Sequence, residues 1–510
     1  MKVIDTVSGT QIVDRQGSHS QRSSPRPVEE RAVYSIYALA LAVSVSVWLI
    51  AVRAPLWLDE TGSFWVIKKG FSQIQPRLTL SFPAYFYILW FSTKMIGTSE
   101  IALRVPSILA MLVAVYLLYL AARELFERDI AIIAAVIFCL HPIVIAESID
   151  ARPYAFAALA TNAAILILIR LRRSSSNWLA ALFGLTAAWI VWFHYLFGVI
   201  LPALVLCFVA IKFRDRKTLW RQFGIAFSVF AVGFLPVIPE LLHMLRTTQT
   251  HVYEVAPNLV DLVLTLGSGW LLFIFGMTAL VAAARTRPDQ KAHLPQGWNI
   301  LVCAFLALIP ILILYGVSVG TSIHCFVPRH RLVAVPGISL CWALILRSFR
   351  PRALRLLFCV SFVVITAYQF YSSPSSRQHG YTWKYALEVA EKNASVDEAP
   401  VVVCSDFPES DYDVLSAVSV KNTFFFAPLS YYELSVPVVP LPRALNGEAM
   451  RVGSQFVQDA AKKHERFLAL AFEPSYKTLD WLAQNAAVTY SVHNLGIYDG
   501  VKVLEFVPRS

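Results

Sequence analysis

The chain has 510 residues and a formal net charge of +11, with 57% hydrophobic, 13% aromatic and only 15% charged residues. A mean hydropathy of +0.58 excludes an ordinary soluble protein. The seven cysteines show neither a disulfide framework nor zinc-site spacing, and no nucleic-acid-binding motif is present. The composition therefore predicts a polytopic α-helical membrane protein.

The N-terminal residues 1–30 are polar and Ser-rich without a cleavable signal pattern, so we predict a cytoplasmic tail before a membrane domain over 31–373. A membrane-spanning helix needs about 20 mainly apolar residues. Suitable runs lie at 32–52, 105–122, 130–146, 153–169, 222–239, 262–284, 298–323, 332–346 and 356–373. The run 177–211 is too long for one crossing and is expected to turn near His194, which makes about eleven spans.

Every second loop is rich in Lys and Arg. These basic loops read "ARELFERD", "RLRRSSSN", "KFRDRKTLWR", "RTRPDQK" and "RSFRPRALR". Cytoplasmic loops retain positive charge, so we place all five inside, where anionic membrane lipids attract them. The loop 54–104 then lies on the outer face.

The segment 78–93, "LTLSFPAYFYILWFST", is uncharged but short and contains Pro83. If it crossed the membrane, every later basic loop would lie outside, against the positive-inside rule. We therefore predict an interfacial or re-entrant helix whose aromatic residues lie among the lipid headgroups.

Polar and turn-forming residues return after residue 373. The runs "PVVVCS", "RFLALAF" and "VKVLEFV" predict strands, whereas "YTWKYALEVAEK" and "GSQFVQDAAKKH" predict helices. We expect a small α/β domain over 374–510. Because the number of predicted spans is odd, this domain is expected to be extracytoplasmic.

Two adjacent carboxylates, Asp59 and Glu60, follow Trp57 in the outer loop. A solvated, helix-starting pair is the simplest interpretation. However, a carboxylate at the membrane boundary is costly unless it is paired or used. The second acidic segment "AESIDARPY", with Glu147 and Asp150, emerges on the same predicted face. The two loops can therefore form one site.

The order of these motifs resembles a known family. "LWLDE" is followed by "FPAYFYIL", "SEIALRVPSILAMLVAVYLLYLAAREL", "IDARPYAFAAL" and later "FVPRHRLVAVPG". Over roughly residues 30–350 the chain is similar to membrane glycosyltransferases of the GT-C fold, in particular the bacterial relatives of protein O-mannosyltransferases and of the lipid A aminoarabinose transferase. It departs from the family in having Ser81 and Phe82 before a single Pro83, where a His or Lys often precedes the prolines.

The resemblance implies transfer of a sugar from a polyprenyl-phosphate-linked donor to an envelope acceptor, which could be a lipid, a glycan or a protein. The reaction would take place on the outer face of the cell membrane, most simply a bacterial inner membrane. Asp59 matches the family's first-loop acid and is the expected base. Glu60 could orient Asp59, contact the acceptor, or bind a divalent metal with Asp59.

The leaving phosphate needs a cationic partner, and a planar guanidinium offers two parallel hydrogen bonds. The expected phosphate-binding residues are Arg152, Arg329, His330 and Arg331; the expected supporting residues are Arg104, Glu147, Asp150, Tyr154, His194 and Tyr195. Three simpler interpretations remain open. Arg152 could pair with Asp150 or Glu147, Arg331 could be an interfacial anchor, and His194 could be structural.

Two other functions share many spans. A transporter or flippase of lipid-linked glycans would be expected to show an internal repeat and charges near the midplane. The sequence shows no convincing repeat, and its charges collect at one face. A ligase-type transferase is the alternative among enzymes.

Overall fold

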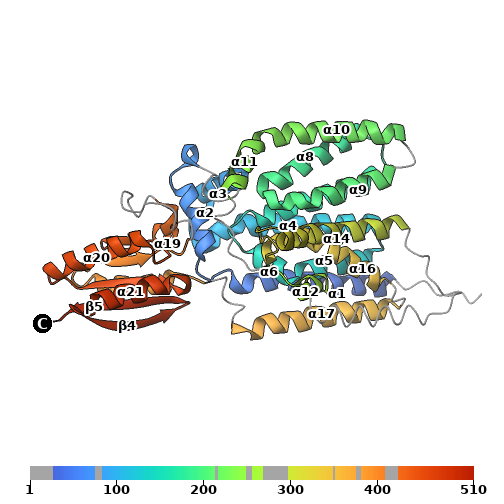
Figure 1. Ribbon diagram of the computed structural model, residues 1–510. Coiled ribbons are helices and arrows are strands. Elements are labelled where there is room, and N and C mark those ends of the chain that lie inside the picture. Colours follow the sequence, from blue (N-terminus) through green and yellow to red (C-terminus); the bar gives the residue numbers. More distant parts are fainter. Residues whose placement is uncertain are drawn as a thin grey trace, which may run out of the picture.

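The computed structural model describes residues 27–74, 83–212, 216–247, 256–267, 297–347, 351–374, 381–407, 410 and 423–509. The helices of the membrane domain run side by side, and a sheet-containing C-terminal part lies against one end of them (Figure 1).

The described residues contain seven helices that are long and apolar enough to cross a membrane, or eight if one bent pair is counted as a span. The protein is therefore a multi-pass membrane protein. The long helices are α1 (Pro27–Ser46, continued by η1, Val47–Ala51), α4 (Glu100–Leu125), α7 (Tyr154–Leu171), α10 (Arg216–Phe234, followed by η5, Leu235–Val237, and α11, Ile238–Thr247), α14 (Gly297–Gly320), α16 (Val335–Leu346, preceded by α15, Pro328–Arg331, and η8, Leu332–Ala334) and α17 (Arg352–Ser372).

The run 177–211 turns at His194 as predicted. Its two shorter apolar helices are α8 (Asn177–Phe193) and the segment formed by η4 (Tyr195–Ile200) and α9 (Leu201–Lys212). Most of the predicted span 262–284 lies outside the described residues, which reach Gly267 in α12 (Leu259–Gly267).

The predicted span at 130–146 is a bent pair of helices that together meet the length and hydropathy requirements for a span. It consists of α5 (Arg128–Cys139) and α6 (Pro142–Ser148), whose axes differ by 67°. Pro142 lacks a backbone N–H, and its ring obstructs a continuing helix, so the chain bends there. The bend directs the acidic segment 147–150 toward the start of α2 (Leu58–Lys68).

Three of the basic loops meet at one end of the membrane domain, called here the basic end. Glu124 at the end of α4 pairs with Arg173 after α7, with 3.1 Å between the charged groups. Glu127 before α5 pairs with Arg347 after α16 at 2.7 Å. The opposite ends of the same helices carry residues 52–60 and 149–153, and we call this the domain end.

The aromatic segment forms α3 (Pro83–Ile96), and residues 75–82 lie outside the described residues. With 14 residues, α3 is not among the helices that meet the length and hydropathy requirements for a span. This agrees with the expected non-spanning helix. In Figure 1, α3 lies beside α2 at the domain end.

The C-terminal part contains a five-stranded sheet in the order β2 (Val438–Leu441), β1 (Val401–Cys404), β3 (Phe467–Phe472), β5 (Val501–Pro508) and β4 (Tyr490–Tyr498). Strands β2, β1 and β3 are parallel, whereas β5 and β4 are antiparallel to their neighbours. One face packs on α18 (Lys384–Ala394), and the other packs on α20 (Gly447–Lys462) and α21 (Tyr476–Ala486). The three predicted strands are present; β2 and β4 were not predicted.

This C-terminal part docks on α2 through η13 (Phe424–Phe426) and α19 (Ala427–Tyr431). The rings of Phe424 and Trp65 are 5.6 Å apart, edge to face. A Cβ atom at Gly62 would lie 2.9 Å from the Phe424 ring, so only glycine allows this close approach. The Lys68 ammonium also donates to the Ser430 carbonyl at 2.9 Å and pairs with Glu433 at 2.7 Å.

Candidate functional site

Helix α2 begins with a hydrogen bond that orients the Glu60 carboxylate. Trp57 is the N-cap, and its backbone N–H donates to the Glu60 carboxylate at 3.2 Å. Negative charge in the first turn is favourable because unpaired N–H groups and the helix dipole point toward it. Successive helical residues are about 100° apart. Asp59 and Glu60 therefore face different surroundings.

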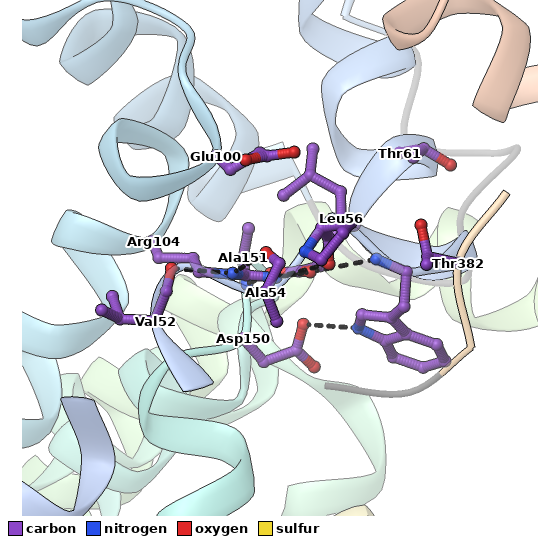
Figure 2. Close-up of polar contacts among 12 residues, drawn as sticks. Val52, Ala54, Leu56, Thr61, Glu100, Arg104, Asp150, Ala151 and Thr382 are labelled. Atoms are coloured by element: carbon purple, nitrogen blue, oxygen red, sulfur yellow. Dashed lines mark hydrogen bonds and ion pairs between the residues drawn. The ribbon is translucent and has the colours of Figure 1, made fainter. Parts of the chain in front are cut away.

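Glu60 is fully buried and forms an ion pair with Arg104 of α4, which is also fully buried. The Arg104 Nε–H donates to Glu60 Oε1 at 2.8 Å. The same oxygen accepts the backbone N–H of Ala151 at 2.9 Å. Figure 2 shows that Arg104, Ala151 and Asp150 lie close together. We call the Glu60–Arg104 pair the clamp.

Arg104 also fixes the chain that leads into α2. Its guanidinium donates to the carbonyls of Val52 at 2.9 Å, Ala54 at 2.6 Å and Pro55 at 3.1 Å. A guanidinium has five N–H donors in a rigid plane, so one side chain can satisfy all these acceptors. The clamp thus determines both the path of residues 52–55 and the start of α2.

Asp59 forms ion pairs with two arginines from distant parts of the chain. Its Oδ2 atom lies 3.0 Å from Arg329 and 3.6 Å from Arg152. The Asp59 side chain is 19% exposed, and Arg329 is 37% exposed. Oδ2 accepts a hydrogen bond from Arg329, whereas within the described residues no hydrogen bond reaches Asp59 Oδ1. Asp59, Arg152 and Arg329 are called the Asp59 cluster.

The second acidic segment meets the start of α2, as the sequence led us to expect. Asp150 Oδ1 accepts the indole N–H of Trp57 at 3.1 Å. The carboxylate within ion-pair distance of Arg152 is Asp59. Burial opposes the charge of Arg152, yet the carboxylate of Asp59 holds the pKa of Arg152 above its ordinary value. Glu147 is buried, and its Oε2 has no hydrogen-bond partner among the described residues.

Aromatic and histidine rings pack directly beside the two arginines. His194 lies 4.9 Å from the Tyr154 ring, 5.5 Å from Tyr195 and 5.5 Å from His330. The Arg152 guanidinium lies 5.7 Å from the Tyr154 ring centroid. Burial, with the nearby cations, holds the pKa of His194 below its ordinary value, so its ring is neutral. Four predicted residues therefore form an uncharged wall beside the cationic pair.

Arg331 lies apart from the Asp59 cluster. Its guanidinium donates to the hydroxyl of Thr265 in α12 and lies 5.0 Å from the Phe326 ring centroid. The structure thus brings Arg152 and Arg329 together and directs Arg331 elsewhere.

A divalent cation does not fit at Glu60. Its two oxygens accept hydrogen bonds from Arg104, Ala151 and Trp57, so a metal would have to displace a buried guanidinium. Asp59 alone would give a metal ion a single carboxylate ligand, and the neighbouring guanidiniums of Arg152 and Arg329 would repel the ion. Within the part of the chain that the structure describes, no three His, Cys, Asp or Glu side chains form a group that could hold a metal ion.

The sequence placed the C-terminal part on the same face as the Asp59 loop, but no motif indicated which of its residues come near this site. Asp406 follows β1 and is buried; burial raises its pKa to about 6, and nearby Asp59 contributes. Burial, Asp406 and Asp59 likewise raise the pKa of Tyr381. An acidic residue at the carboxyl end of a parallel strand is a usable signal for a site, because such ends point out of the sheet together.

Comparisons with known proteins bear on the fold. The family model described as dolichyl-phosphate-mannose-protein mannosyltransferase matches residues 76–243. A search of curated protein sequences found no match. The structure is similar to ArnT from Cupriavidus metallidurans in the apo state, with a TM-score of 0.57 and 14% identity over 93% of this chain and 98% of ArnT.

It is also similar to ArnT bound to undecaprenyl phosphate, with a TM-score of 0.55 and 11% identity over 93% of this chain and 98% of ArnT. The oligosaccharyltransferase from Archaeoglobus fulgidus in the apo form has a TM-score of 0.52 and 14% identity over 92% of this chain and 70% of that protein. These similarities show that the chain has the GT-C fold.

Proposed function

We propose that this protein transfers a glycosyl group from a polyprenyl-phosphate-linked donor to an acceptor at the outer face of the membrane. The observation that carries the proposal is the Asp59 cluster. It combines a carboxylate that has one uncommitted oxygen with two guanidiniums, at the end of the membrane domain opposite the basic loops.

The proposed step is a single displacement. The acceptor hydroxyl attacks the anomeric carbon of the donor, and Oδ1 of Asp59 takes its proton. The bond between the anomeric carbon and the phosphate oxygen breaks, and the phosphate leaves with the electron pair. Arg152 and Arg329 stabilise the charge on this phosphate. Attack from the face opposite the leaving group inverts the anomeric configuration.

Two further observations support this donor class. ArnT was solved with undecaprenyl phosphate, and the archaeal oligosaccharyltransferase AglB was solved with dolichol-phosphate and an inhibitory peptide. The neutral wall beside the arginines, formed by Tyr154, His194, Tyr195 and His330, can exclude water around the leaving phosphate. No step requires a metal ion, and Glu60 acts by holding Asp59 in place.

The test compares cells that have the gene, lack it, or have it restored. Lipid-linked sugars and envelope glycans are measured by mass spectrometry. We expect loss of one glycan and accumulation of one polyprenyl-phosphate sugar when the gene is absent. Unchanged pools would contradict the proposal. Movement of the lipid-linked sugar across proteoliposome membranes without any transferred product would support a flippase instead.

The proposed sidedness predicts which surface cysteines react from outside. Val488 of the C-terminal part is 83% exposed, and the Arg173 side chain at the basic end is 71% exposed. The native cysteines are buried or half-buried and give a low background. In intact cells, a membrane-impermeant thiol reagent should label Val488→Cys and spare Arg173→Cys. The reverse pattern would place the Asp59 cluster in the cytoplasm.

A further inference from the structure

Tyr432, directly after α19, connects the C-terminal part to the chain that precedes Asp59. Its hydroxyl accepts the backbone N–H of Leu56 at 2.7 Å and donates to the Glu100 carboxylate at 3.0 Å. A phenolic hydroxyl can act as donor and acceptor at once. This one group therefore links residues 376 positions apart in the sequence.

Glu100 has a second partner from the C-terminal part. The Lys384 ammonium lies 3.1 Å from its carboxylate and 5.9 Å from the Tyr432 ring centroid. The side chains of Lys384 and Glu100 are 30% and 21% exposed, so this pair lies in a partly buried contact. The Lys384 ammonium thereby holds the Glu100 carboxylate in the position where it accepts the hydrogen bond of the Tyr432 hydroxyl.

The chain before Asp59 is therefore held from two directions. Arg104 in α4 binds the carbonyls of Val52, Ala54 and Pro55, and Tyr432 binds the N–H of the next residue, Leu56. Leu56 is 1% exposed and lies three residues before Asp59. The Arg104 contacts come from the membrane domain, and the Tyr432 contact comes from the C-terminal part.

We propose that Tyr432 is a positioning residue for the Asp59 cluster, so that the C-terminal part completes the geometry of the transfer site. This inference rests on the proposed function. Without the hydroxyl, residues 56–58 can shift, and the Asp59 carboxylate moves relative to Arg152 and Arg329. A displacement of about 1 Å at reacting groups can lower a rate about a hundredfold, so a smaller loosening still has a measurable effect.

The Tyr432 hydroxyl keeps its proton near neutral pH. Burial is the main cause that raises the pKa of Tyr432 above its ordinary value, and the negative charge of Glu100 adds to it. The contact with Glu100 therefore does not depend on pH near neutrality.

The test substitutes Tyr432→Phe, which removes the hydroxyl and keeps the ring. Tyr431→Phe is the matched control, because its hydroxyl donates to the Thr98 carbonyl at 3.0 Å in the same contact region, whereas the Tyr432 hydroxyl binds Leu56. Relative to this control, Tyr432→Phe should lower kcat about five- to tenfold with an unchanged KM for the donor. Hydrogen exchange should be faster at the Leu56 amide in Tyr432→Phe.

Equal kcat values and equal exchange in the two variants would overturn the inference. If Tyr432→Phe melts below the control, Glu100→Ala provides a second test, because it removes the acceptor and keeps the tyrosine. It should also lower kcat at constant donor KM, and an unchanged kcat would overturn the inference. A wild-type protein without any transfer activity would instead contradict the proposed function.

Discussion

Asp59 and Glu60 are neighbours in sequence but lie in opposite kinds of surroundings. Glu60 is fully buried, and both of its oxygens accept hydrogen bonds. Asp59 is 19% exposed and pairs through one oxygen with two partly exposed arginines. One carboxylate therefore maintains structure, whereas the other remains able to react. Burial and hydrogen-bond occupancy, more than proximity, distinguish the two roles.

The clamp and the Asp59 cluster also differ in where their arginines come from. Arg104 lies 44 residues after Glu60, and its helix α4 is separated from α2 by α3. Arg329 lies 270 residues after Asp59 and begins a different part of the bundle. The clamp can therefore form early and locally, while the Asp59 cluster needs most of the membrane domain to be assembled.

The largest effect is expected from Asp59→Asn, which keeps the side-chain volume but removes the base. Transfer should fall by about 10²–10⁴-fold, the usual contribution of a positioned general base. The melting temperature should stay close to that of the wild-type protein, since the side chain is partly exposed. Turnover is measured on purified protein with a polyprenyl-phosphate sugar. Near wild-type turnover would remove Asp59 as the base.

Glu60→Gln should act mainly on stability. It leaves the buried Arg104 cation without an ionic partner, and breaking one side of a buried pair costs about 3–5 kcal/mol. We expect a lower melting temperature and a lower yield. A variant that melts like the wild-type protein but has lost transfer would show that Glu60 takes part in the chemistry.

Replacing either arginine of the Asp59 cluster should impair use of the donor. Arg152→Ala or Arg329→Ala loses a charge-assisted contact worth about 1.5–3 kcal/mol, which is a ten- to hundredfold decrease in kcat/KM for the donor. Lysine at either position should restore part of the kcat/KM for the donor. Arg331→Ala is the matched control, since Arg331 binds Thr265. Unchanged donor kinetics in both alanine variants would rule out the phosphate contact.

The smallest expected effect concerns a third carboxyl, that of Asp406. Its titration makes the stability of the protein depend on pH. Folding raises its pKa from 3.8 to about 6, so the folded protein binds this proton more tightly than the unfolded chain does. The stabilisation is fully present below about pH 4 and is lost as the pH rises through 6. Its full size is about 3 kcal/mol, because the pKa changes by about two units and one unit corresponds to about 1.4 kcal/mol.

Asp406→Asn should remove this dependence. From pH 5 to pH 8, the melting temperature of the wild-type protein should fall more than that of the variant. Parallel melting curves across this range would show that Asp406 does not titrate on unfolding.

Hydropathy and charge were enough to predict the multi-pass membrane architecture and the turn at His194, because a bilayer imposes length and polarity on each span. They did not reveal the bend at Pro142, since the apolar run continues through it. Strand β2 was missed because it is short and contains Pro440, and β4 because Gly496 and a bulge interrupt its pattern.

The candidate site was predicted in its residue types, and an arginine–carboxylate contact was expected of Arg104, but the other pairings were not predicted. The motif around Asp59 and Glu60 was recognisable, but two adjacent acidic residues in a sequence do not show which carboxylate will be buried. That depends on the rotation of α2 against Arg104. The roles of Tyr432 and Asp406 had no local signal, because their partners come from across the whole chain.

The hydrogen bond between Leu56 and Tyr432 also sets an order in time during synthesis. A ribosome adds about 5–20 residues per second, so the 376 residues between them take about 20–75 s to make. Once Arg152 has been made, and for the rest of that interval, the nascent chain carries Asp59, Arg104 and Arg152 but lacks the hydroxyl that holds Leu56. A truncated translation product that ends before Tyr432 would insert its helices and remain without a completed site.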